Sequence, residues 1–176
     1  FALDRLGIHA VLSAKPHVIK AADRVIFPGV GHAAAAMDKL KQSGVDKLIP
    51  SLKQPGLGIC LGMQLMCEHS DEGNTQGLGI FKGRVQAFDS GLKVPQIGWN
   101  AIRELKGPLF KDVAEASYIY MVHSYYAPLS ADTIAVCDYG TPYSAALAHN
   151  NFYGTQFHPE KSSGVGAQIL KNFIDL

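Results

Sequence analysis

A cysteine held between two glycines is the feature that most constrains the fold of this chain. Residues 58–62 read Gly-Ile-Cys-Leu-Gly, which is the nucleophile-elbow pattern with sulfur in place of the serine oxygen. A short apolar run, residues 57–59, precedes Cys60, and the uncharged, helix-competent residues 61–67 follow without a linker. A side chain on a tight turn between strand and helix needs small neighbours two positions away on each side. The pattern therefore predicts a strand–turn–helix unit of an α/β domain, with the sulfur at the turn.

The position of Cys60 at such a turn has a chemical consequence. The sulfur would lie at the N-terminus of the following helix, where free N–H groups and the helix dipole favour thiolate over thiol. The N–H of Leu61, the residue after the nucleophile, is then an expected donor to an oxyanion. The alternative is that Cys60 is a small core hydrophobe, and the elbow alone leaves both interpretations open. Cys67 and Cys137 have no such setting, and we expect both in the core.

A histidine and a glutamate at the end of a predicted strand supply the other two groups that a thiolate nucleophile needs. His158 follows the apolar residues 152–157 and is followed by Pro159 and Glu160. In an extended chain residues i and i+2 point to the same side, so His158 and Glu160 project together, while Pro159 stops ladder pairing. Alone, His-Pro-Glu is also compatible with a surface turn. Together with the elbow it favours a catalytic triad, with His158 as base and Glu160 as its orienting carboxylate.

A second glycine-containing segment, residues 28–34, follows a predicted strand and opens a predicted helix. Within it, residues 29–34 match G-x-G-x-x-A, the dinucleotide-binding fingerprint, but that fingerprint requires an acidic residue about twenty positions further on. Residues 47–55 contain no carboxylate, so dinucleotide binding is the weaker of two hypotheses. The other is that the glycines leave backbone N–H groups free to face an anion, here the oxyanion above Cys60.

Composition excludes several classes of function. The 176 residues are enough for one domain with a substantial core, and 47% of them are hydrophobic. Sixteen Lys and Arg against fifteen Asp and Glu give a net charge of +1 without a block of like charge, which indicates neither a nucleic-acid face nor a basic membrane face. The three cysteines form no disulfide framework and no zinc-ligand spacing. With no secretory signal and no apolar stretch long enough for a bilayer, we expect a reducing, cytoplasmic setting and no metal.

Strands alternate with helices in the first part of the sequence, and consecutive strands follow in the second. This order predicts an α/β domain with a mixed sheet. Residues 1–7 are typical of the end of an amphipathic helix closed by Gly7, so we expect a single domain, residues 1–176, that lacks an element before Phe1. The expected strands are residues 8–12, 24–27, 57–59, 83–88, 96–105, 118–123, 133–139, 145–149 and 152–157, and the expected helices are residues 33–42, 46–52, 61–67 and 165–176.

These motifs, with three further segments, resemble a known family. Residues 58–64 (Gly-Ile-Cys-Leu-Gly-Met-Gln) and 156–162 (Gln-Phe-His-Pro-Glu-Lys-Ser) are similar to the class I (triad-type) glutamine amidotransferases. Residues 28–32 (Pro-Gly-Val-Gly-His), 94–100 (Val-Pro-Gln-Ile-Gly-Trp-Asn) and 120–125 (Tyr-Met-Val-His-Ser-Tyr) look like the bacterial glutaminase subunits of imidazole glycerol phosphate synthase within that family. The resemblance covers the whole chain in the right order.

The resemblance implies a fold and a reaction. The fold is the flavodoxin-like α/β domain of the class I amidotransferases, with a mixed central sheet, and the reaction is the hydrolysis of glutamine to glutamate and ammonia. Cys60 would attack the side-chain carboxamide to give a glutamyl thioester. His158 would protonate the departing ammonia and then activate water, and Glu160 would hold His158.

The resemblance also assigns binding roles around that triad. The groups that would bind the oxyanion are the backbone amides of three residues: Leu61, Val30 and Gly31. Those that would hold the glutamine are Gly29, Gln64, His123, Ser124 and Tyr125.

A protein partner is implied as well, and no cofactor. In the family, ammonia passes to a cyclase subunit with a (β/α)8 barrel, which makes imidazole glycerol phosphate and aminoimidazole carboxamide ribotide in histidine biosynthesis. The family's first strand is absent before Phe1, and the end at Leu176 without an appended barrel favours a separate partner, in a heterodimer, over a fused enzyme. The residues expected at that interface are Pro95, Gln96, Trp99, Asn100, Tyr120 and Lys161.

Two other functions stay open on the residues alone. A cysteine hydrolase that acts by itself on a peptide or an ester would use the same triad. A flavodoxin-type nucleotide-binding module would instead use residues 29–34. A response of glutamine hydrolysis to a cyclase separates the amidotransferase from the hydrolase, and saturable binding of NAD or FMN that is unaffected by Cys60→Ala would favour the nucleotide-binding module.

Overall fold

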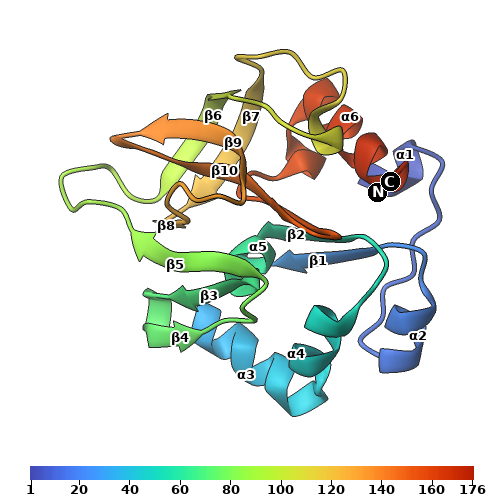
Figure 1. Ribbon diagram of the computed structural model, residues 1–176. Helices are drawn as coiled ribbons and strands as arrows, with labels where there is room; N and C mark the ends of the chain where they lie inside the picture. The colour runs from blue at the N-terminus through green and yellow to red at the C-terminus, as the bar shows by residue number, and fades with distance from the viewer.

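The centre of the domain is a seven-stranded mixed sheet (Figure 1), seen in a computed structural model that describes residues 1–176. The strand order is β1-β2-β11-β10-β9-β6-β7. The first three strands of this order are parallel, and every other neighbouring pair is antiparallel. The prediction of an α/β domain with a mixed sheet is therefore confirmed. The strands are β1 (Val25–Gly29), β2 (Gly56–Cys60), β6 (Gln96–Arg103), β7 (Tyr118–His123), β9 (Thr133–Tyr139), β10 (Thr141–His149) and β11 (Phe152–Thr155).

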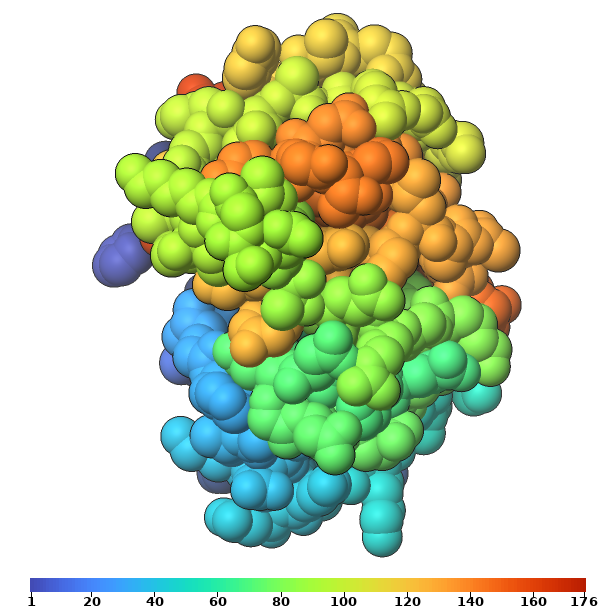
Figure 2. Space-filling view, turned by 90° about the vertical axis from the view of Figure 1, so that its left-hand side faces the viewer, coloured from blue at the N-terminus to red at the C-terminus, as the bar shows by residue number.

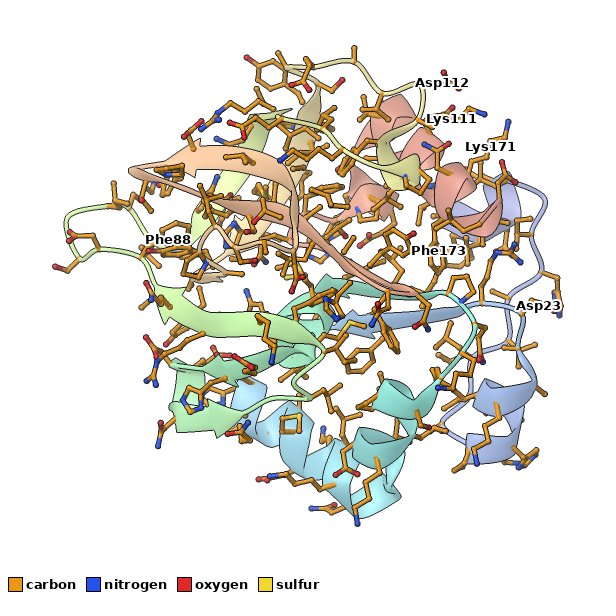
Figure 3. The ribbon with its side chains drawn as sticks, viewed as in Figure 1. Asp23, Phe88, Lys111, Asp112, Lys171 and Phe173 are labelled. Carbon is orange, nitrogen blue, oxygen red and sulfur yellow. The ribbon has the colours of Figure 1, made fainter.

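Helices lie on both faces of the parallel strands. α3 (Ala33–Ser43) and α4 (Val45–Leu48) connect β1 to β2, because parallel neighbours need a crossover connection, and both lie on one side of these strands in Figure 1. α6 (Ser163–Ile174) covers the other side. Figure 3 shows Phe173 pointing from α6 toward the sheet, where its buried ring meets Tyr153 edge-on with centroids 6.4 Å apart. The short helices are α1 (Ala2–Arg5), α2 (Pro16–Ala21) and α5 (Leu61–Met66).

The two larger of three hydrophobic clusters fill the spaces between these layers. The larger has 17 buried residues and joins the sheet to α6, with Leu57 and Ile59 of β2 against Ile169 and Phe173. The other has 13 and joins α4 and α5 to the opposite face of the sheet. β2 thus lies between two cores, which explains why its residues 57–59 are continuously apolar.

A smaller sheet lies beside α3, and of its four strands the sequence predicted only β5, as residues 83–88. Its strand order is β4-β3-β5-β8, and the helix expected over residues 61–67 ends at Met66 because Cys67 begins β3. Two of the four strands have only two residues, too few for any periodicity to be read. The bounds are β3 (Cys67–Ser70), β4 (Thr75–Gln76), β5 (Phe81–Ala87) and β8 (Tyr125–Tyr126).

The connection from β5 to β6 packs against the β9–β10 hairpin, and Figure 2 shows its green atoms beside the orange ones of the hairpin. The Tyr139 hydroxyl donates a hydrogen bond of 2.6 Å to the carbonyl of Lys93. At the hairpin turn, Gly140 has a positive φ of 69° and leaves room for the Leu92 side chain. These contacts position the start of β6 and the residues just before it, which lie next to the site.

The strand expected over residues 8–12 is wrong. These residues form neither strand nor helix, and Val11 and Leu12 are 69% and 99% exposed. An apolar run becomes a strand only where another strand supplies hydrogen-bond partners, and residues 8–12 pair with none. β1 is the edge strand of the large sheet. The expectation of an absent strand before Phe1 stays a prediction.

No helix combines the length and the apolar character needed to cross a membrane.

Candidate active site

Cys60 lies on a strained turn between β2 and α5. Its φ of 53° and ψ of −114° are rarely adopted by residues with a side chain, as the elbow pattern predicts. A Cβ on Gly58 would lie 2.8 Å from the backbone nitrogen of Met63. One on Gly62 would collide with the carbonyl oxygen of Phe27 in β1. Both glycines are therefore required by the close approach of backbone, and the expected strand–turn–helix unit is confirmed.

His158 reaches Cys60 because their strands are neighbours. β11 runs parallel to β2 with Thr155 opposite Ile59, and the chain continues past Thr155 to His158 at the same edge of the sheet. His158 is 6% exposed, and its Nδ1 donates a hydrogen bond of 2.7 Å to Oε1 of Glu160. The predicted pairing of His158 with Glu160 is thus present, and Nε2 is left for the sulfur.

Two partners hold a proton on this imidazole. The hydrogen bond with Cys60, and after it the one with Glu160, raise the pKa of His158 to about 9, against an opposing effect of burial. For Glu160, burial by itself would raise the carboxyl pKa, but the hydrogen bond from His158 outweighs it and the pKa is lowered. The arrangement favours an imidazolium between a sulfur and a carboxylate.

We expect the His158 ring resonance to titrate with a midpoint near 9 in NMR spectra recorded across pH. In Glu160→Gln, which removes the negative partner, the midpoint should move toward 6.5, and in the control Glu115→Gln it should not. Since the folded chain holds this proton more tightly, His158 contributes stability that is complete below about pH 6.5 and lost as the pH rises through 9. A midpoint of 6.5 in the unmodified chain would contradict the assignment.

A cavity of about 340 Å³ opens beside the elbow. It reaches both Cys60 and His158, and it is bounded by most of the residues that the sequence placed in the oxyanion loop and the substrate pocket. Gly29 is the exception, since it faces a neighbouring cavity of about 360 Å³ and packs against the elbow as the strand partner of Cys60. The predicted residues that line the 340 Å³ cavity are Val30, Gly31, Leu61, Gln64, His123, Ser124 and Tyr125.

Comparison with known proteins identifies the family. The model of the family "Glutamine amidotransferase class-I" matches residues 8–176. The chain belongs to the class I glutamine amidotransferases. It is 54% identical over 179 residues to a protein of Bacteroides fragilis (strain YCH46), covering all of this chain and 91% of the relative. It is 48% identical to one of Pasteurella multocida (strain Pm70), covering 99% and 89%. Both relatives are named imidazole glycerol phosphate synthase subunit HisH.

Solved structures agree with the fold of this amidotransferase. One described as a glutamine amidotransferase aligns with a TM-score of 0.74 at 18% identity, covering 99% of this chain and 89% of that chain. Another, a glutamine amidotransferase from Thermotoga maritima, aligns with a TM-score of 0.57 at 21% identity, covering 87% and 61%. At these identities the likeness concerns the fold alone.

The surroundings of His123 keep its imidazole neutral. Nδ1 donates a hydrogen bond of 2.8 Å to the carbonyl of Tyr125, and Nε2 lies 3.2 Å from the hydroxyl of Tyr143. Burial lowers the pKa of His123 to about 4, and the hydrogen bond to Tyr125 only partly opposes this. A neutral His123 therefore holds the turn at Ser124 and Tyr125 in the cavity wall of the amidotransferase.

The six expected interface residues separate into an outer and an inner group. Side chains alternate along β6, so that Trp99 is 49% exposed while Gln96 is 1% exposed. The amide of Gln96 accepts a hydrogen bond of 2.9 Å from the Tyr143 hydroxyl and donates one of 3.0 Å to Asn100. The side chain of Gln96 is thus turned inward, and its place at the partner interface stays a prediction.

The outer group surrounds one aromatic pair. Trp99 lies opposite Tyr120 of β7, with ring centroids 6.0 Å apart, and the Lys161 ammonium lies 6.0 Å from the centre of the Tyr120 ring. Pro95 lines the mouth of the Cys60 cavity together with Lys161. These four residues connect the cavity to the exposed side of β6.

Sequence reasoning missed Glu72, which also lines the cavity. Its Oε2 accepts a hydrogen bond of 2.7 Å from the N–H of Ala33, the first residue of α3. No pattern marks Glu72, because a 3-10 turn (Glu72–Asn74) of the small sheet brings it there. A carboxylate at this helix terminus also disfavours a bound pyrophosphate, which the dinucleotide hypothesis would place at the same N–H groups.

Gln156 was also missed. It is fully buried and its Nε2 lies 3.8 Å from the sulfur of Cys60. The signal for it was available, since Gln156 precedes His158 by two positions and shares its side of the extended chain.

Proposed function

We propose that this chain is the glutaminase subunit of imidazole glycerol phosphate synthase. It hydrolyses glutamine to glutamate and ammonia and delivers the ammonia to a cyclase subunit. The observation that carries the proposal is the meeting of an elbow cysteine and His158 in one cavity, with Glu160 bonded to the far side of the His158 ring. Relatives about 50% identical over the whole chain carry the name of that subunit.

The reaction follows from the order of the three side chains. The Cys60 thiolate attacks the carboxamide carbon of glutamine, and the carbonyl oxygen becomes an oxyanion. The His158 imidazolium then gives its proton to the departing nitrogen, so that ammonia leaves and a glutamyl thioester remains. Water attacks the thioester after losing a proton to His158, and glutamate is released with the thiolate restored. Glu160 keeps Nδ1 protonated throughout, which leaves Nε2 to carry the exchanged proton.

Backbone amides would stabilise the oxyanion. The N–H of Leu61 starts α5 directly after the nucleophile, the position that an elbow gives to its first donor. The loop with Val30 and Gly31 lines the same cavity and would supply the second. Two aligned donors in a site from which water is displaced are worth several kcal/mol to the transition state, about 3 kcal/mol for each.

Two polar groups of the cavity fit the amino-acid end of glutamine. The Gln64 amide gives both hydrogens of Nε2 to the protein, so its Oε1 is free to accept from an ammonium group. Glu72 uses Oε2 for the N–H of Ala33, which leaves Oε1 and the negative charge to the cavity. We propose that these two groups bind the α-ammonium of the substrate.

Glu72→Gln should raise the KM for glutamine by about 10-fold to 100-fold with little change in kcat. The carboxamide keeps an acceptor for Ala33 but loses the charge, and a hydrogen bond to a charged group contributes about 1.5–3 kcal/mol. Steady-state kinetics with the cyclase present measures both constants. The control Glu68→Gln alters a carboxylate that contacts Lys82 and Gly83 outside the cavity, and it should leave KM unchanged. An equal fall in kcat for Glu72→Gln would assign it a role in the reaction step instead.

The partner would dock where the cavity opens toward β6. Exposed apolar side chains are concentrated there, on Val30 at 83%, Ile97 at 63%, Trp99 at 49% and Tyr118 at 60% exposure. Large aromatic side chains commonly anchor protein interfaces. A cyclase with a (β/α)8 barrel, covering this face, would receive ammonia before it is protonated in solvent.

The experiment that tests the function measures glutamine hydrolysis with and without the cyclase and its ribotide substrate. A large rise, accompanied by imidazole glycerol phosphate, supports the proposal, and no response would favour a cysteine hydrolase that acts alone. In a binding assay Trp99→Ala should weaken the complex about thirtyfold, the loss of ~2 kcal/mol expected for an aromatic anchor. The control Leu12→Ala removes a side chain that is 99% exposed and far along the chain from β6.

A further inference from the structure

Two buried glutamines connect the sulfur of Cys60 to the wall of the cavity. Gln156 is fully buried and Gln64 is 4% exposed. Nε2 of Gln156 lies 3.8 Å from Sγ of Cys60, and its Oε1 accepts a hydrogen bond of 2.9 Å from Nε2 of Gln64. The reaction described above gives Gln156 no task, although its amide touches the attacking atom.

The direction of these hydrogen bonds is decided by a backbone group. The carbonyl of Tyr125 can only accept, and it receives hydrogen bonds of 2.8 Å from Nε2 of Gln64 and of 2.8 Å from Nδ1 of His123. The end of Gln64 that faces this carbonyl must therefore be its NH2 group. The same NH2 group donates to Gln156, whose facing end must be its oxygen. Only the NH2 end of Gln156 is then left for Cys60.

The sulfur of Cys60 consequently lies between one hydrogen-bond acceptor and one hydrogen-bond donor. The carbonyl of Val122 is 3.9 Å away and can accept a hydrogen bond from the thiol, so it favours the protonated form. The NH2 group of Gln156 is a donor, and donors favour the anion. If the buried amide of Gln156 turned its oxygen toward the sulfur, its NH2 group would face the NH2 group of Gln64, and one N–H of Gln64 would lose its acceptor, at a cost of about 1–3 kcal/mol.

We propose that Gln156 is a catalytic residue that donates a hydrogen bond to the Cys60 thiolate, and that Gln64 is the positioning residue that fixes the direction of this bond. Gln64 thus contacts both reactants, since its NH2 group positions Gln156 beside the nucleophile and its Oε1 faces the substrate. The hydrogen bond moves no proton. It stabilises the nucleophile in the state that attacks, and it adds to the donor that His158 supplies. Because it assumes that Cys60 is the nucleophile, this inference rests on the proposed function.

The test is the rate at which iodoacetamide alkylates Cys60 across pH, measured by mass spectrometry of the full chain without glutamine or cyclase. Gln156→Met keeps the length of the side chain but removes the donor. It should move the midpoint of the pH profile up by about one unit and lower the alkylation rate about tenfold at pH values below both midpoints, since one unit corresponds to one hydrogen bond of about 1.4 kcal/mol. Gln168→Met, which removes an amide from α6, is the matched control and should leave the profile unchanged.

The coupling to Gln64 is tested with the same measurement. Gln64→Met should move the midpoint in the same direction by a smaller amount, and the double variant should move it no further than Gln156→Met alone. If Gln156→Met does not fold, Gln156→Glu has the same shape and places a carboxyl beside the sulfur, which should move the midpoint up further. A folded Gln156 variant with an unchanged profile would overturn the proposal, because a purely structural role would lower the melting temperature without moving the midpoint. Alkylation needs no glutamine turnover, so this outcome is separate from failure of the proposed function.

Discussion

Replacing Cys60 by alanine should lower glutamine hydrolysis by about 10⁴-fold or more. Without the sulfur no thioester forms, and removal of the nucleophile from a catalytic triad has effects of this size even when its partners remain. The variant should fold normally, since Cys60 is only partly buried and alanine fits the turn no worse than cysteine. The measurement is glutamate release by the complex with cyclase, under conditions in which the unmodified chain is saturated.

Covalent labelling checks the same prediction independently. An electrophilic analogue of glutamine should modify the unmodified chain once and Cys60→Ala not at all. Cys67→Ala is the matched control, because Cys67 is 1% exposed and its pKa is raised to about 12, chiefly by burial, so that it holds no thiolate near neutral pH. If Cys60→Ala still becomes labelled, the nucleophile is another cysteine and the triad assignment is lost.

Gly62→Ala should be the most damaging of the small substitutions near the site. A Cβ at this position would collide with the carbonyl oxygen of Phe27 in β1, and β1 cannot move away without disturbing its pairing with β2. We expect a loss of about 3 kcal/mol in the free energy of unfolding, together with loss of activity as the elbow moves. Urea titration followed by circular dichroism gives the first quantity, and the coupled glutaminase assay gives the second.

Gly164→Ala provides the comparison for this effect. Gly164 lies in α6, is exposed, and has nothing within 4 Å of the position of an added Cβ. Alanine there should stabilise the chain by about 0.5 kcal/mol, as expected for a helical site, and leave activity unchanged. Equal unfolding free energies for the two variants would show that the close approach at Gly62 is relieved at little cost.

The sequence was most informative where neighbouring residues in the chain carry the site together. The elbow around Cys60 and the pair His158–Glu160 are short contiguous patterns whose geometry follows from local backbone rules, and the structure has both. Gln156 obeys the same rule of alternation and could have been predicted with them.

The sequence was least informative where position depends on a distant partner. Glu72 enters the cavity through a turn between very short strands, and no local pattern marks such a residue. Residues 8–12 have the composition of a strand but lack a neighbouring strand to pair with, which composition does not report. Gln96 was expected at the partner interface with Trp99 by resemblance alone, and the alternation along β6 turns its side chain inward.

The neighbouring positions of β2 and β11 have a consequence for how this domain would lose activity on heating. Cys60 and His158 are each attached to one of two strands that share a continuous ladder of backbone hydrogen bonds, from Gly56 and Phe152 to Ile59 and Thr155. Both strands lie at the centre of the molecule, so the two groups separate only when this ladder opens. On heating, activity should therefore be lost in the same transition in which the domain melts. The amide hydrogens of the ladder should exchange with solvent only through unfolding of the whole domain.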